Sequence, residues 1–172
     1  PMANPRPRER VPASVTRTEM TWIVLPTHTN NHDTAFGGQI AAWCDICAAV
    51  AAQRFVRGPV VTASMDSLHF LKPVKRGMVV VLQGMVNRAW NTSVEVGVRV
   101  DAEDPISGQR VHCCSAYLTF VALDGHGGKR PVPELDDEGD PQVARRQREA
   151  ALRRTARLQV RDARRLEQVG GV

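Results

Sequence analysis

The sequence predicts an α+β fold in which a curved antiparallel sheet wraps around one long helix. Three observations support this prediction: a nearly uninterrupted apolar stretch from Gly37 to about Val56, one strand-like segment before it, and four strand-like segments after it. The chain has 172 residues, of which 42% are hydrophobic and 24% charged, so it can bury one sizeable core. This composition excludes collagen-like, disulfide-scaffold and wholly disordered classes. No apolar run is long enough for a membrane helix, so no membrane is expected as a partner.

The expected elements follow the chain in a simple order. A short strand over residues 20–25 is followed by a polar loop over residues 27–34, which leads into the helix. Gly58 and Pro59 terminate that helix, which is apolar almost all round and is therefore expected to be buried all round. The later strands are expected over residues 60–70, 78–88, 92–102 and 110–123, and the third of them alternates valines on one face, namely Val94, Val96, Val98 and Val100.

The chain is expected to divide into four parts. Residues 1–18 form a flexible lead, rich in Pro and Arg and lacking the apolar core of a secretory signal, and residues 19–130 form the domain. Residues 131–141 form an acidic linker to a basic, helical tail over residues 142–172. Nine arginines in this tail outnumber three acidic residues, although the net charge of the whole chain is only +5. Nucleic acid is not expected as a partner, because a nucleic-acid-binding domain would spread its positive charge over the fold.

The cysteines indicate neither a disulfide framework nor a metal site. Two lie in the apolar helix without a second pair of ligands nearby, and two are adjacent in a strand. All four are expected to pack as small apolar side chains, namely Cys44, Cys47, Cys113 and Cys114. A reducing, cytoplasmic location fits them best. The spacing of His28, His32 and Asp33 in the polar loop matches no common metal site, so no metal is expected.

Asp45 is the strongest candidate for a functional residue. Between Gly37 and Gln53 it is the only ionisable side chain apart from two thiols. Burying an unpaired carboxylate costs several kcal/mol, so a purely structural sequence is expected to avoid it. Desolvation is expected to raise the proton affinity of Asp45, which suits a general base. The alternative is an aspartate on a solvent-facing polar stripe, but small residues around Asp45 form no such stripe.

Two further features could stabilise negative charge near a reacting group. Gly37 and Gly38 open the helix, where a ligand could approach free backbone N–H groups at the positive end of the helix dipole. Such donors can stabilise an oxyanion, although a Gly-Gly pair also occurs in ordinary tight turns. Asn30 could hold a water or a carbonyl group beside them. The alternative is that its amide only orders the polar loop.

The spacing of these groups predicts a site shared between two copies of the chain. Gly38 and Asp45 are seven residues apart, which corresponds to about 10.5 Å along a helix. A water, a base and oxyanion donors must lie within steps of about 3 Å around one reacting carbon. Asp45 is therefore expected from one subunit, and Asn30 with the two glycines from another. Such a homodimer would also cover the open edge of a single sheet.

Several motifs follow one another along the chain, namely the stretch from Leu25 to Gln39, Trp43 with Asp45, the segment from Val61 to Asp66, Phe70, and the segment from Asn87 to Val96. Together they resemble the motifs of the hotdog-fold acyl-CoA thioesterases. The resemblance covers residues 20–123 and then the tail, and it is closest to the group of the brown-fat-inducible thioesterase and the cytoplasmic acetyl-CoA hydrolase. Asp33 stands where relatives commonly have glycine, although aspartate tolerates the left-handed backbone better than most residues.

The resemblance implies hydrolysis of an acyl-CoA to a free acid and CoA, with CoA as part of the substrate and no cofactor. It assigns Asn30 and Asp45 as catalytic residues of opposite hotdog units, and Gly37 with Gly38 as the oxyanion turn. It also implies homodimers that often assemble into hexamers as trimers of dimers. The segments that would contact CoA are Ala63, Ser64 and Met65 together with Thr92, Ser93 and Val94.

The resemblance also extends to the basic tail, which looks like a helix that contacts CoA. Arginine is an apt partner for the diphosphate and the 3′-phosphate of CoA. The candidates are Arg153, Arg154 and Arg157, and the alternative is a solvated basic helix. A different function, a non-catalytic regulatory module that binds acyl-CoA, would need a DNA-reading element, for which only this tail is available. The acyl chain cannot be inferred, because five large side chains could line an acyl pocket or only the core, namely Trp43, Phe55, Met65, Phe70 and Trp90.

Overall fold

The computed structural model describes the backbone of residues 8–169 and the side chains of residues 8–165. The start of the expected lead (1–7) and the end of the expected tail (170–172) lie outside the described residues. The elements are, in chain order, β1 (Arg10–Pro12), the 3-10 helix η1 (Ala13–Thr16), β2 (Thr18–Ile23), the 3-10 helix η2 (Pro26–His28), α1 (Gly37–Val56), β3 (Val60–Met65), β4 (Val79–Ala89), β5 (Ser93–Glu103), β6 (Arg110–Ala122), β7 (Glu134–Asp136) and α2 (Pro141–Val169).

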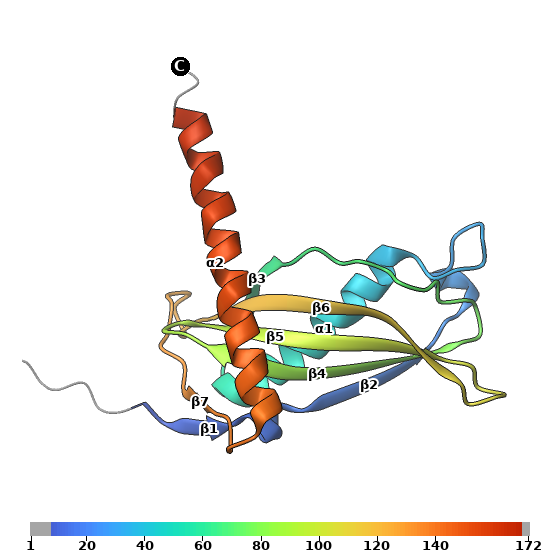
Figure 1. Cartoon of the computed structure of the whole chain (residues 1–172), viewed down its shortest axis with the longest axis horizontal. Coiled ribbons are helices and arrows are strands. Elements are labelled where there is room, and N and C mark those ends of the chain that lie inside the picture. The colour runs from blue at the N-terminus through green and yellow to red at the C-terminus, as the bar shows by residue number, and fades with distance from the viewer. Residues whose placement is uncertain (1–7, 170–172) are drawn as a thin grey trace, which may run out of the picture.

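The main layer is a five-stranded antiparallel sheet. Its strand order is β2-β4-β5-β6-β3, so β2 and β3 form its edges. α1 lies along one face of this sheet, and α2 crosses the other face (Figure 1). The four alternating valines of β5 are buried and belong to the core formed with α1. The predicted α+β arrangement, with a long helix against a curved sheet and a basic helix after it, is confirmed.

The C-terminal end of α1 is capped by groups that the sequence does not reveal. Arg57 adopts the left-handed conformation with a φ of 53°, and its N–H donates to the Gln53 carbonyl oxygen at 2.8 Å. Arg130 donates through Nη2 to the Val56 carbonyl oxygen at 2.7 Å. A Cβ on Gly58 would lie 2.6 Å from this guanidinium. Gly58 therefore leaves room for the arginine that satisfies the helix end.

The prediction that α1 is buried all round is wrong for the single chain. Gly38 and Ala42 are exposed, and 48% of Ile46 is exposed. Asp45 lies on this same side and is half-buried rather than enclosed. The physical reason is that one sheet covers only one side of a helix, and the small residues along the other side meet no further layer within residues 8–169.

The expected flexible lead and linker differ from what the structure describes. β1, from the lead, pairs in parallel with β7, from the linker, as a separate two-stranded sheet. Ion pairs join Arg8 to Glu134 and Arg10 to Asp136, and the Ser14 backbone N–H and hydroxyl also donate to a linker carboxylate, that of Glu138. The backbone pairing of β1 with β7, together with these side-chain contacts, joins the two segments in the folded chain. The division into domains otherwise stays a prediction.

The four cysteines are buried free thiols, as expected. Burial raises the pKa of the Cys44 thiol to about 12, that of Cys47 to about 11 and that of Cys114 to about 12. These thiols are therefore protonated at neutral pH and are poor nucleophiles. Neither helix, within the described residues, combines the length and the apolar character that crossing a membrane requires.

Candidate active site

Asp45 contacts the edge strand beside α1. The Thr62 hydroxyl, from β3, donates a hydrogen bond to Asp45 Oδ1 at 2.7 Å. The pairing of β3 with β6 shifts register between Thr62 and Ser64, so β3 bulges at Ala63. This contact orients a carboxylate on the uncovered side of the helix, where a substrate or a second chain can reach it.

Thr62 is a candidate site residue that the sequence alone does not reveal. Its neighbours in β3 give no signal, because a threonine in an exposed strand is ordinary. Its contact with Asp45 depends on β3 lying next to α1, which is a property of the folded sheet. The stretch from Val61 to Asp66 is one of the motifs of the resemblance, but only the residues after Thr62 carry an implied role.

The glycine turn presents free backbone donors. Within the described residues, neither the Gly37 N–H nor the Gly38 N–H donates a hydrogen bond, and the first N–H groups donating to the Phe36 carbonyl are those of Gln39 and Ile40. A Cβ built on Gly38 would meet nothing within 4 Å, so space is open in front of this turn. Two unpaired donors at the start of a 20-residue helix favour binding of negative charge.

Asn30 orders the loop that precedes α1. Its Oδ1 accepts hydrogen bonds from the N–H groups of His32 (2.8 Å) and Thr34 (3.3 Å), and its Nδ2 donates to the Thr34 hydroxyl at 2.9 Å. Asp33 inside this loop has a φ of 56°, the left-handed conformation that the sequence anticipated for it. In the single chain, the amide therefore serves the alternative, structural role. The second Nδ2 hydrogen is still available to a ligand.

The strand segments expected to contact CoA lie at the β3 edge and at the start of β5. Ala63 and Met65 are exposed, and Ser64 is half-buried. Thr92 and Ser93 are half-buried, whereas the Val94 side chain lies in the core. A contact from Val94 to a ligand is thus restricted to its backbone.

Two of the three tail arginines face carboxylates of the domain. Glu95 is fully buried on the face of β5 opposite the valines, and it accepts hydrogen bonds from Arg153 Nη2 (2.6 Å) and from Asn87 Nδ2 (3.1 Å). Arg157 donates to Asp66 at 2.7 Å and lies 3.4 Å from Glu95. These contacts hold α2 against the sheet.

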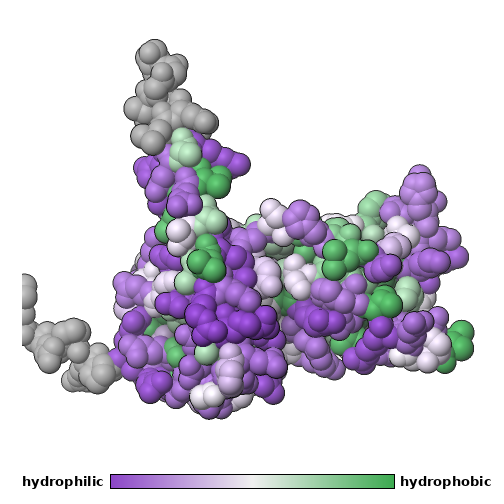
Figure 2. Space-filling model, viewed as in Figure 1, coloured by the Kyte–Doolittle hydropathy of each residue, from purple (hydrophilic) through white to green (hydrophobic). Residues whose placement is uncertain are grey.

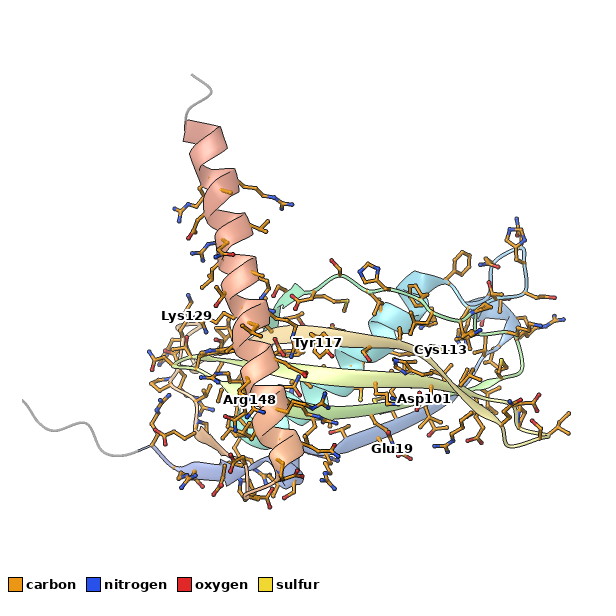
Figure 3. All side chains as sticks on the ribbon, viewed as in Figure 1. Glu19, Asp101, Cys113, Tyr117, Lys129 and Arg148 are labelled. Carbon is orange, nitrogen blue, oxygen red and sulfur yellow. The ribbon has the colours of Figure 1, made fainter. Side chains whose placement is uncertain are left out.

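The surroundings of Arg153 explain how a charged pair is tolerated there. Its guanidinium lies 3.7 Å from the centroid of the Tyr117 ring, and Tyr117 lies beside α2 in Figure 3. Burial opposes the charge on Arg153, but the hydrogen bond and the charge of Glu95 outweigh it and raise the pKa of this guanidinium. A Cβ on Gly97 would lie 2.6 Å from Asn87 Nδ2, so this glycine gives the amide room beside Glu95.

Arg154 differs from its two neighbours. Its guanidinium lies 4.6 Å from the centroid of the Trp90 ring, and no carboxylate within residues 8–165 forms an ion pair with it. Burial lowers the pKa of Arg154, and the charges of Arg157, Arg161 and Arg88 lower it further. Of the three predicted arginines, Arg154 is the one whose charge an external anion could neutralise.

Two of the large side chains considered for an acyl pocket, Trp43 and Phe55, pack in the core. Trp43 is buried and stacks on Trp22 with ring centroids 5.7 Å apart, while His28 meets Trp43 edge-on and accepts the Leu25 N–H through Nδ1 at 3.1 Å. Phe55 is buried in the core. No group of three or more potential metal ligands exists among the described residues.

Comparison with known sequences identifies relatives of this chain. The family model described as the thioesterase superfamily matches residues 32–108. An uncharacterised acyl-CoA thioester hydrolase of Bacillus subtilis is 41% identical over 120 residues, which cover 70% of both chains. Acyl-coenzyme A thioesterase 11 of Mus musculus is 39% identical over 152 residues, or 86% of this chain. The match spans only a quarter of the length of that mouse relative.

Solved structures agree with the sequence relatives. An acyl-CoA hydrolase from Bacillus cereus superposes with a TM-score of 0.86 at 33% identity, covering 96% of this chain and 99% of that one. A Staphylococcus aureus acyl-CoA hydrolase in complex with butyryl coenzyme A and coenzyme A gives a TM-score of 0.80 at 34% identity, with 92% and 94% covered. A hexameric acyl-CoA thioesterase superposes with a TM-score of 0.84 at 34% identity, covering 88% of this chain and 96% of that one.

The fold and the relatives together define a class. A curved antiparallel sheet around a long helix, with acyl-CoA hydrolases as structural neighbours, is the hotdog fold. The chain belongs to the thioesterase superfamily. The Staphylococcus aureus enzyme has been solved as three variants in which an asparagine, an aspartate and a threonine are each replaced by alanine. Those three residues have the same spacing along that chain as Asn30, Asp45 and Thr62 have in this one.

Proposed function

We propose that this chain hydrolyses acyl-CoA thioesters to free carboxylic acids and CoA. The observation that carries the proposal is the placement of Asp45, a lone carboxylate on the uncovered side of an apolar helix and oriented by the Thr62 hydroxyl at 2.7 Å. The unpaired N–H groups of Gly37 and Gly38 add the second half of a hydrolytic site. The relatives are named acyl-CoA hydrolases, which is the same class of reaction.

The proposed chemistry uses groups that the chain itself supplies. Asp45 accepts a proton from a water whose oxygen attacks the thioester carbonyl carbon, or its own carboxylate attacks that carbon and water later releases the acid. The carbonyl oxygen becomes negative and accepts hydrogen bonds from the glycine turn, while the free Asn30 N–H orients the carbonyl or the water. The carbon–sulfur bond then breaks, and the sulfur leaves as the CoA thiol after taking a proton. No cofactor is needed for these steps.

The site is proposed to form between two copies of the chain. Asp45 and Gly38 are about 10.5 Å apart along α1, too far to serve one carbonyl carbon. The outer edge of β3 is unpaired within residues 8–169, and apolar side chains, among them Ile46 and Val61, lie exposed beside it. A second copy pairing along β3 would cover these side chains and extend the sheet. Such dimers are proposed to assemble into hexamers, in line with the hexameric neighbours.

Arg154 is proposed as the phosphate contact of the tail. Replacing it by alanine is expected to raise KM for acyl-CoA about tenfold, with kcat unchanged, because a charge-assisted contact to a non-reacting phosphate contributes equally to ground state and transition state. Steady-state kinetics at two salt concentrations measures this, and the loss should shrink at high salt. Arg148→Ala is the control, since Arg148 is an exposed residue of the same helix (Figure 3). Equal KM values for the two variants would remove Arg154 from the site.

Thr62 is proposed to position Asp45. Thr62→Val keeps the shape of the side chain but removes the donor, and a lost hydrogen bond to a charged group corresponds to a fall in kcat of about tenfold or more. Thr62→Ser retains the hydroxyl and is expected to keep most of the activity. Steady-state kcat and KM of the three proteins provide the measurement. Equal kcat values for the valine variant and the parent protein would contradict this role.

A thiol-release assay tests the function directly. The chain is incubated with acetyl-, butyryl- and octanoyl-CoA, and free CoA is followed with a thiol reagent. We expect release at a kcat above about 1 s⁻¹ for at least one substrate. The alternative, a regulatory module that binds acyl-CoA without hydrolysis, predicts binding of the same compounds and no release. Because all four cysteines are free thiols, a reducing, cytoplasmic location is proposed for the enzyme.

A further inference from the structure

A preformed hollow lies beside the glycine turn. It has a volume of about 320 Å³ and is bounded by the start of α1 and by the loop between β3 and β4. Its lining includes Gly37, Ile40, Phe70, Leu71 and Val74. Ile40 and Val74 are buried and form an apolar floor. The visible surface of α2 is mostly hydrophilic, whereas apolar side chains appear over the part of the body away from that helix (Figure 2).

Backbone hydrogen bonds hold both walls of this hollow. The Ala35 N–H donates to the Val74 carbonyl oxygen at 2.8 Å, and the Arg76 N–H donates to the Asp33 carbonyl oxygen at 2.9 Å. The Leu71 N–H donates to a carbonyl of β6 at 2.8 Å. The loop after β3 is thereby tied both to the loop before α1 and to the sheet, so the hollow exists without a ligand.

Phe70 lies where the hollow meets the proposed oxyanion donors. A Cβ built on Gly37 would lie 3.1 Å from Cε2 and 3.3 Å from Cζ of Phe70, so the ring packs directly against this glycine. Yet 45% of Phe70 remains exposed, and the adjacent Leu71 is also exposed. A large apolar side chain that is fixed against a proposed catalytic turn and half open to solvent is well suited to contact an apolar ligand.

We infer that this hollow receives the acyl chain and that Phe70 limits the chain length. The inference rests on the proposed function. A carbonyl oxygen held by the Gly37 and Gly38 N–H groups leaves the carbonyl carbon with two substituents, the sulfur and the acyl chain. The sulfur leads to the charged part of CoA, so the acyl chain takes the apolar side. A hollow of about 320 Å³ is at the small end of ligand pockets, which indicates short acyl groups.

The test compares rates over a series of acyl-CoA chain lengths. kcat/KM is measured from acetyl-CoA to dodecanoyl-CoA for the parent protein, Phe70→Ala and Phe70→Trp. The parent is expected to prefer short chains. Phe70→Ala should move the optimum to longer chains, with a gain of about fourfold for each added methylene group that the enlarged hollow accepts. Phe70→Trp should move it to shorter ones.

A control substitution outside the lining of the hollow shows whether an altered chain-length profile is specific to Phe70. Ile106→Ala removes a highly exposed apolar side chain from the turn after β5, and it should leave the chain-length profile unchanged. If each Phe70 variant changes kcat/KM by the same factor for every chain length, the hollow does not hold the acyl chain. Absence of CoA release by the parent protein from any substrate would instead overturn the proposed function. Should Phe70→Ala fold poorly, the shift toward shorter chains in Phe70→Trp decides the inference alone.

Discussion

Replacing Asp45 by asparagine is expected to lower kcat for acyl-CoA hydrolysis by about 10²–10⁴. The amide keeps the size of the side chain and an oxygen that can accept the Thr62 hydroxyl, so the contact at 2.7 Å can persist. What is lost is a group able to take a proton from water or to attack the thioester. Because Asp45 is half-buried and makes one side-chain hydrogen bond within the described residues, the free energy of unfolding should change by only about 0.5 kcal/mol.

Thiol release and thermal unfolding, measured on the same preparation, separate chemistry from folding. Asp162→Asn is a suitable control, because it makes the same substitution at an exposed aspartate of α2. We expect the control to match the parent protein in both measurements. An Asp45→Asn variant with an undiminished kcat would show that the carboxylate has no part in the reaction.

Replacing Glu95 by alanine is expected to destabilise the fold more than any of the other substitutions. Glu95 is fully buried and pairs with Arg153, whose side chain is only 21% exposed and lies over the Tyr117 ring. Removing the carboxylate leaves Arg153 near the sheet without its partner, and breaking such a buried pair costs about 3–5 kcal/mol. Urea unfolding at a fixed protein concentration measures the loss.

The matched control for this substitution lies on α2. Glu149 forms an exposed i,i+4 pair with Arg145, and Glu149→Ala is expected to cost about 0.5 kcal/mol or less. A variant at Glu95 that is no less stable than the variant at Glu149 would mean that the buried network does not anchor α2. Glu95→Gln keeps an acceptor for Asn87, so its loss of stability should lie between those of Glu95→Ala and Glu149→Ala.

The helices were predictable because local signals mark them. Gly37 and Gly38 open α1, and Gly58 and Pro59 follow its end. In the basic tail, no glycine or proline occurs from residue 142 to residue 169, which is where α2 ends. The strands of the meander were predictable from alternation and turn residues to within a few positions, except that β3 ends at Met65 and the expected strand continued to Phe70. Beyond Met65 the chain turns away to form one wall of the hollow.

The features that could not be predicted depend on contacts between distant segments. β1 and β7 have three residues each, and only their pairing across the fold makes them strands. Thr62 becomes a site residue because β3 lies beside α1. The resemblance implies that Arg153 and Arg157 contact CoA phosphates. In the structure, Glu95 and Asp66 pair with these two arginines, which a sequence does not reveal. With those two charges paired inside the chain, Arg154 is the stronger candidate for a phosphate contact.

The exposed side of α1 is the main departure from the sequence-based expectation. Asp45 was expected to be enclosed in apolar surroundings, and in the single chain it is half-buried. The exposed small and apolar residues around it, such as Ala42 and Ile46, explain the difference if a second copy supplies the missing layer. Burial of Asp45 is then a property of the assembly rather than of one chain.

The central claim, a site shared by two copies, is tested most directly by mixing two inactive variants. Asp45→Asn removes the carboxylate, and Asn30→Asp keeps acceptors for the loop hydrogen bonds while placing a charge beside the oxyanion. After subunits exchange, half of the dimers combine the two variants and carry one intact site of two. We predict recovery of about a quarter of the parent activity. No recovery, with mixed dimers verified by native mass spectrometry, would contradict the claim.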